Sequence, residues 1–304
     1  MNTSSLIKSL LLFAVFFIYS NSYAQVPPKK EQNGGVQNVK TKVVTVTTVE
    51  GFLNSIASNT TIKLKGHSFF ISDLASANKV GKYYSFVEVY DGYELLISDV
   101  KNLKIVGTGN TPVRMYARPD YGNVISFNNC ENVTIENVDA GHGASKGSCV
   151  GGVFKIENSK DFYIKNTIMY GSGIEGITTN NVSNLVCVNS FIRSCTYSIM
   201  TLNGSNDISF ENCVFEDNGV YDLVNIQSCS RVNFKNCSFE KNRTENSNYS
   251  DYSLFKVNQS NAITLQHCFI EANATDYLCN DSKILQFQKV EVNHNEFTKG
   301  KYKD

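Results

Sequence analysis

The stretch ISFENCVF, from Ile208 to Phe215, decides the fold because it recurs along the chain. It returns with small changes as VNFKNCSF from Val232 to Phe239 and as ITLQHCFI from Ile263 to Ile270. Alignment on the first apolar residue gives eight copies, whose starts lie between 23 and 31 residues apart. A period in this range that changes only by loop insertion is typical of a stacked solenoid. The copies start at positions 103, 133, 162, 185, 208, 232, 263 and 290.

Each copy alternates apolar and polar residues, which predicts a β-strand. A second strand precedes each copy by a short turn, and a third short strand follows near positions such as Phe215, Phe239 and Ile270. Three strands joined by corners make one coil of a parallel β-helix. The preceding strands are predicted at VISF from Val124, VFKI from Val153, GITT from Gly176, IMTL from Ile199, LVNI from Leu223, LFKV from Leu254 and ILQF from Ile284.

The first 24 residues predict a secretory signal peptide. Lys8 gives a positive start, Leu10 to Ile18 an apolar run, and Ser22-Tyr23-Ala24 a cleavage site. The apolar run is too short for a comfortable membrane span. We therefore expect no membrane insertion and a protein that is secreted, periplasmic or at the cell surface. The polar residues 25–42 predict a flexible linker.

We predict that residues 43–100 form an N-terminal cap with the first strands and that residues 101–304 form the repeats. Within the cap, TTVEGFLNSIASN predicts a short amphipathic helix, because Thr47 and Glu50 have capping-box spacing. We expect this helix to cover the open end of the solenoid, which otherwise exposes apolar core and unpaired strand edges. The predicted fold class is all-β, a parallel β-helix with a short N-terminal capping helix.

Charge and composition exclude some partners. The chain has 28 Lys and Arg residues against 28 Asp and Glu residues. A near-neutral surface argues against nucleic acid or an anionic membrane as the main partner. Trp is absent, which weakens the case for a sugar platform of Trp rings, although 16 Tyr residues remain.

Nine cysteines in an exported protein suggest disulfides, but their spacing favours free thiols for some. Cys213, Cys237 and Cys268 have the same phase in three copies, which predicts a column of buried thiols that behave as small apolar residues. Two pairings stay open, Cys187 with Cys195 and Cys130 with Cys149. Because nine is odd, at least one thiol has no partner within the chain.

Four residues after the start of a copy stands an Asn or a His. Asn tolerates the left-handed backbone of a tight corner, and stacked amides can bond along the column. This pattern predicts a structural ladder of corner residues. Its predicted members are Asn137, Asn166, Asn189, Asn212, Asn236, His267 and His294.

The repeated strands, the Asn corner and the variable loop resemble the pectin-lyase-like superfamily of right-handed parallel β-helices, over residues 102–297. The stretches GHGASKGSCVGGVFKI and IMYGSGIEGI are also similar to bacterial right-handed β-helix repeat proteins of unassigned activity. The resemblance implies that polysaccharide lies along the parallel sheet, flanked by the long loops. This fold hosts enzymes, adhesins and structural proteins, so it specifies function poorly.

Gly141-His142-Gly143 resembles the G-H-G element of polygalacturonases, but the N-T-D-G, D-D and R-I-K segments of those hydrolases are absent. Inverting hydrolysis needs a protonated carboxyl and a second carboxylate roughly 6.5–9.5 Å apart. Asp139 and Glu175, with His142 between them, are the candidates for this acid–base role. A loop histidine with two solvated carboxylates is the alternative.

A lyase needs a base next to a uronic acid and a cation that neutralises its carboxylate. Lys155 is the candidate cation, in an outward row with Ser126, Thr178, Thr201, Asn225 and Lys256. Tyr170, Arg193 and Tyr197 are the candidate ligand-binding residues on the loop rim. Gly151 and Gly152 permit either close approach to a ligand or a tight bend.

Glu216, Glu240 and Glu271 recur at one phase and predict a column of carboxylates, with Asn218, Asn242 and Asn273 beside it. Stacked carboxylates repel each other unless they are solvated, protonated or bridged by a hard cation. Ca²⁺ is therefore a candidate ligand, although the fold requires no cofactor. A solvated edge is the alternative.

No complete catalytic set emerges from these motifs. The sequence therefore favours a protein that binds glycans or a surface partner along its sheet and loop rim. The alternative is a lyase or glycoside hydrolase that acts on uronic-acid-containing polysaccharide. The sequence predicts neither the glycan nor the oligomeric state.

Overall fold

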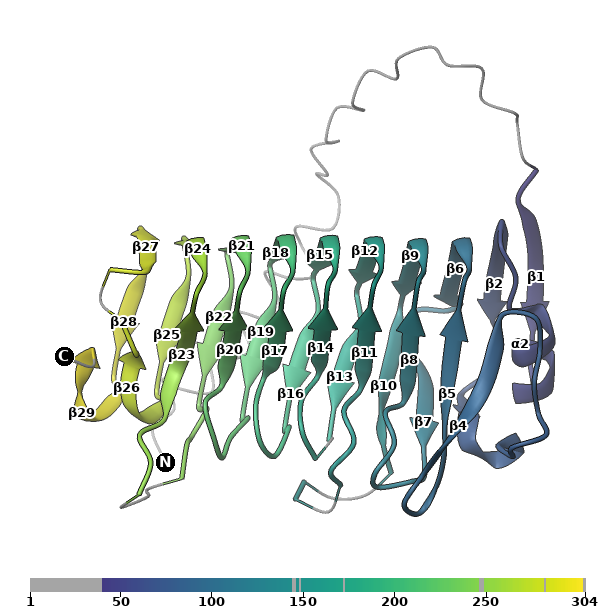
Figure 1. Ribbon diagram of the computed structural model, residues 1–304, viewed down its shortest axis with the longest axis horizontal. Helices are drawn as coiled ribbons and strands as arrows, with labels where there is room; N and C mark the ends of the chain where they lie inside the picture. The colour runs from purple at the N-terminus through teal and green to yellow at the C-terminus, as the bar shows by residue number, and fades with distance from the viewer. Residues whose placement is uncertain are drawn as a thin grey trace, which may run out of the picture. The chain divides into compact units, whose positions relative to one another are not determined.

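The computed structural model describes residues 40–143, 146–147, 149–171, 173–245, 249–281 and 283–302. The predicted signal peptide and most of the predicted linker lie outside these residues. From Lys40 onward the chain forms one compact unit, which Figure 1 shows as a stack of coils. Among the described residues, no helix is long and apolar enough to cross a lipid bilayer.

Three sheets, named A, B and C here, run along the stack, and each coil adds one strand to each sheet in that order. Sheet A contains β1 (Lys42–Val46), β2 (Thr60–Leu64), β6 (Lys101–Gly107), β9 (Glu131–Glu136), β12 (Lys160–Lys165), β15 (Ser183–Val188), β18 (Asn206–Glu211), β21 (Ser230–Lys235), β24 (Asn261–Gln266) and β27 (Leu285–Gln288). Sheet B contains β3 (Ser68–Phe70), β7 (Val113–Ala117), β10 (Val138–His142), β13 (Ile168–Tyr170), β16 (Phe191–Arg193), β19 (Val214–Glu216), β22 (Ser238–Glu240), β25 (Phe269–Glu271) and β28 (Glu291–Asn293).

Sheet C contains β4 (Tyr84–Val89), β5 (Gly92–Ser98), β8 (Ile125–Asn128), β11 (Phe154–Glu157), β14 (Ile177–Asn180), β17 (Met200–Asn203), β20 (Val224–Gln227), β23 (Ser253–Asn258), β26 (Ala274–Cys279) and β29 (Glu296–Tyr302). Neighbouring strands in the described sheets are parallel except β4 and β5, which form a hairpin around Asp91-Gly92. The predicted parallel β-helix is therefore confirmed.

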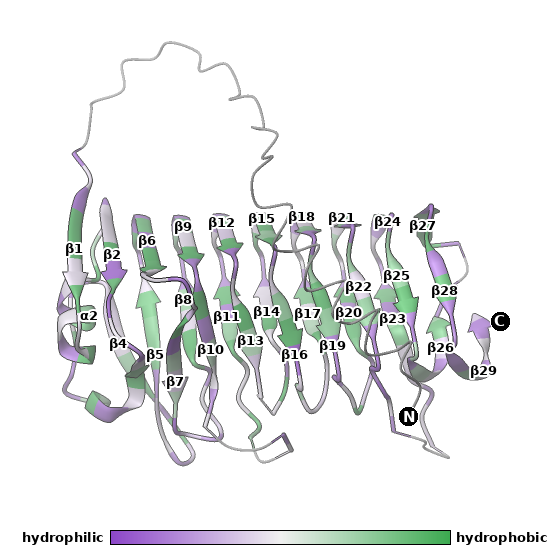
Figure 2. Cartoon of the chain, turned by 180° about the vertical axis from the view of Figure 1, so that it is seen from behind, coloured by the Kyte–Doolittle hydropathy of each residue, from purple (hydrophilic) through white to green (hydrophobic). Residues whose placement is uncertain are grey.

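The core lies inside the stack because alternate residues of each strand point inward. Figure 2 shows hydrophobic residues, in green, on strands of all three sheets. Phenylalanines stack from coil to coil: the rings of Phe210 and Phe234 are 5.0 Å apart and nearly parallel, and those of Phe215 and Phe239 are 4.7 Å apart. Such pairs contribute beyond their buried area, at about 0.5–1.5 kcal/mol each.

The predicted corner ladder between sheets A and B is confirmed for its Asn members. Asn189, Asn212 and Asn236 have φ angles of 50°, 53° and 52°, in the left-handed region that a one-residue corner needs. The Asn212 amide donates to Asn189 Oδ1, and the Asn236 amide donates to Asn212 Oδ1, both at 3.1 Å. The ladder therefore combines the corner with hydrogen bonds along the stack.

The last coil differs from the prediction by one strand. Leu285–Gln288 pairs with β24 in sheet A, and Glu291–Asn293 pairs with β25 in sheet B, so the eighth copy starts near 285 and not at 290. Lys289, with φ 54°, continues the corner ladder after His267, and the prediction of His294 was wrong. Both segments are short and alternating, so their phase was ambiguous. The chain then forms β29, which pairs with β26 in sheet C.

Helix α2 (Val49–Ser55) lies at the N-terminal end of the stack, and the 3-10 helix η2 (Ile71–Leu74) follows β3. The N-cap is Thr48, one residue later than predicted, because its Oγ1 accepts the Gly51 N–H at 3.1 Å. Phe52 and Leu53 are fully buried. This helix therefore adds apolar side chains to the core beside β1 and β2.

All nine cysteines are buried, and none of them forms a disulfide. The predicted column of Cys213, Cys237 and Cys268 is confirmed, and burial raises the pKa of Cys213 and Cys237 well above the usual thiol range. Such thiols are inert because little thiolate forms. Neither pairing that the sequence left open is formed, Cys187 with Cys195 or Cys130 with Cys149.

A second amide ladder, which was not predicted as such, lies inside the corner between sheets B and C. Asn218, Asn242 and Asn273 are buried, and the Asn242 amide donates to Asn273 Oδ1 at 2.9 Å and to the Phe215 carbonyl at 2.9 Å. These residues stand beside the Glu column, as predicted, but their side chains are buried inside the corner. They satisfy backbone groups that the corner would otherwise bury without partners.

Candidate functional site

The outward face of sheet C carries a row of polar side chains in register. Lys155 pairs with Ser126 on one side and with Thr178 on the other, and the row continues through Thr201 and Asn225. Strand alternation predicted this row, and the structure confirms it up to Lys256. Parallel strands are about 4.8 Å apart, so each coil offers one polar group per step along the stack.

A second polar row stands at the corner, two residues before each strand of sheet C. It consists of Asn123, Gly152, Glu175, Ser198 and Asp222. The two rows share hydrogen bonds: the Asn225 amide donates to the Asp222 carbonyl at 3.0 Å, and the Asn123 amide donates to the Ser126 hydroxyl at 3.3 Å. The face is thus a continuous network of hydroxyls, amides and carboxylates.

Glu175 is the most buried carboxyl of this network, at 6% exposed. Its oxygens accept the Thr178 hydroxyl at 2.6 Å and the Thr201 hydroxyl at 2.5 Å. Burial raises the pKa of Glu175, and the two hydroxyl hydrogen bonds only partly oppose that rise. A carboxyl that holds its proton more tightly than usual has the property that a general acid needs.

The lysines of the face are neutralised by neighbouring carboxylates. Lys155 Nζ lies 3.0 Å from Glu157 Oε2, and Lys256 Nζ lies 3.8 Å from Asp222 Oδ2. Lys155 therefore points out of the sheet as predicted, but it already has a partner. Its predicted role as the cation of a lyase stays a prediction.

Three tyrosines stack on consecutive coils directly beside this face. The rings of Tyr197 and Tyr221 are stacked 5.1 Å apart, and the ring of Tyr252 lies 5.5 Å from that of Tyr221. Tyr221 is 43% exposed. We call these residues the tyrosine stack. Each precedes a residue of the corner: Ser198, Asp222 or Ser253.

The glycines of the rim serve coil packing. A Cβ on Gly151 would lie 1.9 Å from the Gly122 carbonyl oxygen, and one on Gly152 would lie 2.9 Å from Asn123 Oδ1. Side chains cannot be accommodated where neighbouring coils approach so closely. The sequence left open whether these glycines allow close approach of a ligand or a tight path of the chain. The structure shows the tight path of the chain.

His142, at the end of β10, is fully buried. Its Nε2 lies 2.8 Å from the Gly122 carbonyl, its Nδ1 has no hydrogen-bond partner, and burial lowers its pKa. A ring without exposed surface cannot reach a ligand on an outer face. The geometry therefore does not favour the predicted catalytic role of His142, which stays untested.

The predicted site residues divide between two faces. Lys155, Glu175 and Tyr197 belong to sheet C and its rim. Asp139 lies on β10 in sheet B, and Tyr170 and Arg193 are register neighbours on β13 and β16 of the same sheet. The structure thus does not gather the predicted acid–base trio of Asp139, His142 and Glu175 on one face.

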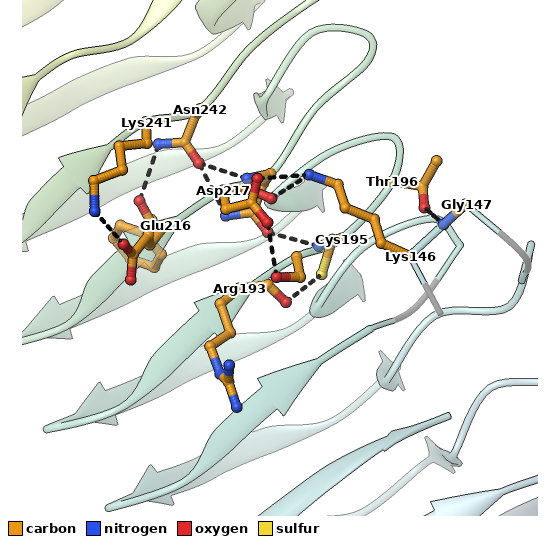
Figure 3. Close-up of polar contacts among 12 residues, drawn as sticks. Lys146, Gly147, Arg193, Cys195, Thr196, Glu216, Asp217, Lys241 and Asn242 are labelled. Atoms are coloured by element: carbon orange, nitrogen blue, oxygen red, sulfur yellow. Dashed lines mark hydrogen bonds and ion pairs between the residues drawn. The ribbon is translucent and has the colours of Figure 1, made fainter. Parts of the chain in front are cut away.

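Two residues of the segment between β10 and β11, Lys146 and Gly147, contact the chain between sheets B and C on later coils. Lys146 Nζ lies 3.0 Å from Asp217 Oδ1 and also donates to the Asp217 carbonyl, and the Gly147 N–H donates to the Thr196 hydroxyl at 2.7 Å. Figure 3 shows Lys146 reaching toward Asp217, while Arg193 points away from this contact. These contacts place Lys146 and Gly147 at the corner between sheets B and C.

The predicted carboxylate column exists, because Glu216, Glu240 and Glu271 are in register on β19, β22 and β25. Each carboxylate has its own partner. Glu216 Oε1 lies 2.6 Å from Lys241 Nζ, Glu240 accepts the Ser238 hydroxyl, and Glu271 Oε1 lies 3.4 Å from His294 Nδ1. In the described part of the chain, no group of three or more acidic, His or Cys side chains could hold a metal ion. The Ca²⁺ prediction gains no support from this arrangement.

Several residues of these faces were not singled out from the sequence. Tyr221 and Tyr252 recur at the phase of Tyr197, so alignment of the loops, and not only of the strands, would have found the tyrosine stack. Asp222 recurs at the phase of Glu175 and could have been found in the same way. Tyr116, on the sheet B face, gives no signal in the repeat because the first coils are irregular.

The sequence matches no family model and no curated protein. Among solved structures, the chain is similar to an alginate lyase from Paenibacillus sp. str. FPU-7, with a TM-score of 0.55 and 10% identity over 84% of this chain and 99% of that chain. It is also similar to a pectate lyase from Bacillus sp. N165 in complex with trigalacturonate, with a TM-score of 0.48 and 13% identity over 75% of this chain and 71% of that one. A surface protein and adhesin of Streptococcus pneumoniae has a TM-score of 0.47 and 9% identity over 86% and 88% of the two chains.

The likeness to the alginate lyase shows that this chain has a right-handed parallel β-helix fold. The fold part of the predicted resemblance is confirmed. Identities near 10% do not show which residues are functional. The function therefore depends on the side chains that the outward faces of sheets B and C present.

Proposed function

We propose that this protein binds glycan chains along the outward face of sheet C, with the tyrosine stack as the wall of the site. One observation carries the proposal: partly exposed aromatic rings on consecutive coils stand directly beside a row of hydroxyls and amides. Aromatic rings pack against the apolar faces of sugar rings, while hydroxyls and amides pair with sugar hydroxyls. The strand spacing repeats both kinds of group along the stack, which suits a polymer better than a single small ligand.

The internal hydrogen bonds of the face support binding rather than structure alone. Groups such as Thr201 and Asn225 are held in one orientation by Glu175 and by the Asp222 carbonyl. A preorganised polar surface binds with less loss of side-chain entropy. Export through a signal peptide, as the sequence predicts, would place this surface among extracellular or cell-surface glycans.

Affinity electrophoresis of the mature protein in gels that contain single polysaccharides tests the proposal. Tyr221→Ala removes the middle ring of the stack and should weaken retention about tenfold, because such a ring contributes roughly 1–3 kcal/mol in comparable stacking sites. Tyr249→Ala is a matched control, since Tyr249 lies between β22 and β23, is 97% exposed and does not belong to the tyrosine stack. Equal retention of Tyr221→Ala and wild type on every polysaccharide that binds would sink the proposal.

A second candidate is an inverting glycoside hydrolase, and it rests on Glu175 together with Asp222. Both residues stand in the corner row with Ser198 between them, so two strand steps, roughly 9.6 Å, separate their backbones. Inverting hydrolases place their carboxyl groups roughly 6.5–9.5 Å apart. The raised pKa of Glu175 suits the acid, and the more exposed Asp222 suits the base that activates water.

Release of reducing ends from a panel of neutral and acidic polysaccharides separates the two candidates. The hydrolase requires turnover that Glu175→Gln and Asp222→Asn each abolish while folding stays intact. Retention without turnover identifies a binding protein. Unsaturated products, followed by ultraviolet absorbance, would instead indicate a lyase and contradict the hydrolase assignment.

A further inference from the structure

The outward face of sheet B carries a different set of side chains on its first five strands. One row runs through Phe70, Tyr116, Gly141, Tyr170 and Arg193, in register from β3 to β16. In the adjacent row Arg114 pairs in register with Asp139. We call Arg114, Tyr116, Asp139, Tyr170 and Arg193 the cationic–aromatic patch.

The aromatic rings of this patch are held by their neighbours. The Arg193 guanidinium lies over the Tyr170 ring, 5.1 Å from its centroid. Gly141 leaves room for that ring, because a Cβ there would lie 2.9 Å from Tyr170 Cδ1 and 2.3 Å from the Tyr170 carbonyl oxygen. On the other side, Tyr116 packs edge-on against Phe70, with the centroids 5.9 Å apart. The two tyrosines are therefore fixed two coils apart with Gly141 between them.

Asp139 lies under the patch with only part of its hydrogen-bonding capacity used. Its side chain is 16% exposed, its Oδ2 lies 3.8 Å from Arg114 Nε, and its buried Oδ1 has no hydrogen-bond partner. Burial raises its pKa, against the opposing effect of Arg193 and Arg114. Both guanidiniums therefore interact electrostatically with this carboxylate, yet neither forms a close ion pair with it.

Arg193 keeps its charge available. Its register neighbour Glu216 is paired with Lys241 at 2.6 Å instead. Within the described residues, the Arg193 guanidinium forms no ion pair. Beyond Glu216 the same row continues with Glu240 and Glu271, so the positive part of the face ends at β16.

We propose that the cationic–aromatic patch is a second binding site that holds an acidic polysaccharide, with the chain running along the stack. Arg114 and Arg193 lie on strands three steps apart, roughly 14 Å, so one small anion does not span them at the level of the backbone. A polymer with repeated carboxylates does. Guanidinium groups pair with carboxylates in a planar, two-bonded geometry, and the two tyrosine rings offer faces to the sugar rings between them.

This site is independent of the proposed glycan face. It belongs to sheet B, it uses none of the sheet C residues, and it selects for charge where sheet C selects for hydroxyls. Its anion contacts also make binding sensitive to salt, because exposed charges are screened over about 8–10 Å at 0.10–0.15 M ionic strength. Binding to sheet C, which offers neutralised lysines, should change little with salt.

Isothermal titration of the mature protein with polygalacturonate tests the assignment. Arg193→Ala and Arg114→Ala should each weaken binding about tenfold, and binding should also weaken as salt is raised. The matched control is Arg231→Ala, because Arg231 is an exposed arginine of sheet A that is paired with Asp207 at 2.6 and 2.9 Å. Both patch arginines are exposed surface residues, so their removal leaves the core intact.

Two further titrations make the outcome decisive. Dextran, a neutral polymer, should bind the Arg193→Ala protein as it binds wild type. Polyglutamate, which has carboxylates but no sugar rings, should bind wild type at least tenfold more weakly than polygalacturonate. Unchanged polygalacturonate binding in both arginine variants, an equal loss in Arg231→Ala, or equal affinity for polyglutamate would each overturn the proposal.

Discussion

Sheets B and C are built by the same repeat, but their outward faces use polar groups in opposite ways. On sheet C the carboxylates accept hydrogen bonds from neighbouring residues: Glu175 accepts two threonine hydroxyls, and Asp222 accepts the Ser253 N–H at 2.7 Å. On sheet B, Asp139 keeps a buried oxygen without a partner, and Arg193 lies over an aromatic ring. The carboxylates of sheet C are therefore satisfied within the protein, whereas the charged groups of sheet B have capacity left for an anionic ligand.

This difference shows which positions of a solenoid are available for function. A position that repeats from coil to coil acquires a neighbour of its own kind, so hydrogen-bonded columns arise as a consequence of the fold. The corner amides are the clearest case. A functional site can be recognised where the residue type changes from one coil to the next. The outer row of sheet B changes in this way from tyrosine to arginine to glutamate. The change of residue along a column is therefore a better guide to a site than the residue type alone.

The largest effect that separates the two faces is expected from Gly141→Ala. The added Cβ would lie 2.3 Å from the Tyr170 carbonyl oxygen, and a backbone atom cannot move aside cheaply. We expect a loss of about 1–3 kcal/mol in the free energy of unfolding, as for other overpacked sites. Displacement of Tyr170 should also weaken binding to polygalacturonate, whereas glycan binding on sheet C should persist. Denaturant unfolding and titration of both ligands measure this.

Gly143→Ala is the matched control for that change. A Cβ at Gly143 meets no atom within 4 Å, so its free energy of unfolding should stay within about 0.5 kcal/mol of wild type. Equal stability of the two variants would show that β10 and β13 are not packed as closely as described, and the division between the faces would lose its structural basis.

A smaller effect is expected from pH on sheet C. Burial raises the pKa of Glu175 in the folded protein, so the folded state holds the proton more tightly than the unfolded chain. The resulting stabilisation is complete below the unfolded pKa, about 4.3, and is lost as the pH rises through the raised folded pKa. Glu175→Gln has no such loss. We therefore expect the Tm of wild type to fall by a few degrees relative to Glu175→Gln between about pH 4 and pH 8.

Thr201→Val sharpens the same test. The Thr201 hydroxyl donates to Glu175 Oε2 at 2.5 Å and favours the charged carboxylate. Its removal should raise the Glu175 pKa further, so the decline in Tm with pH should become steeper than in wild type. Parallel curves for wild type, Glu175→Gln and Thr201→Val would show that Glu175 does not titrate as a buried group.

The repeat made most of the fold predictable, because inward and outward positions alternate strictly within a strand. The outward row of Lys155, the thiol column and the Asn corners follow from that rule. The last coil did not follow, since two short alternating segments fit either phase and only strand pairing decides between them. The N-cap also moved by one residue, because Thr47 and Thr48 can both accept a backbone N–H.

The sites were less predictable than the fold. Asp139 follows the corner between sheets A and B, and Glu175 follows the one between sheets B and C, and the sequence alone did not separate these two corners. Alternation says nothing about residues in loops. His142 looked like a loop histidine, and its burial depends on contact with Gly122, which comes from the preceding coil. Such contacts between coils are set by loop conformation and not by period.

The smallest expected effect comes from Lys241→Ala, which tests why the positive part of sheet B ends at Arg193. Lys241 holds Glu216 at 2.6 Å, although Glu216 is the register neighbour of Arg193. Without Lys241, Glu216 becomes free to pair with Arg193 and to compete with a bound carboxylate. Exposed ion pairs contribute about 0.2–1 kcal/mol, so polygalacturonate should bind about two- to fivefold more weakly. The double change Lys241→Ala with Glu216→Gln should restore the affinity, because the competing charge is gone. A loss that persists in the double variant would mean that Lys241 contacts the ligand itself, and the boundary of the patch would then lie two coils further along the stack.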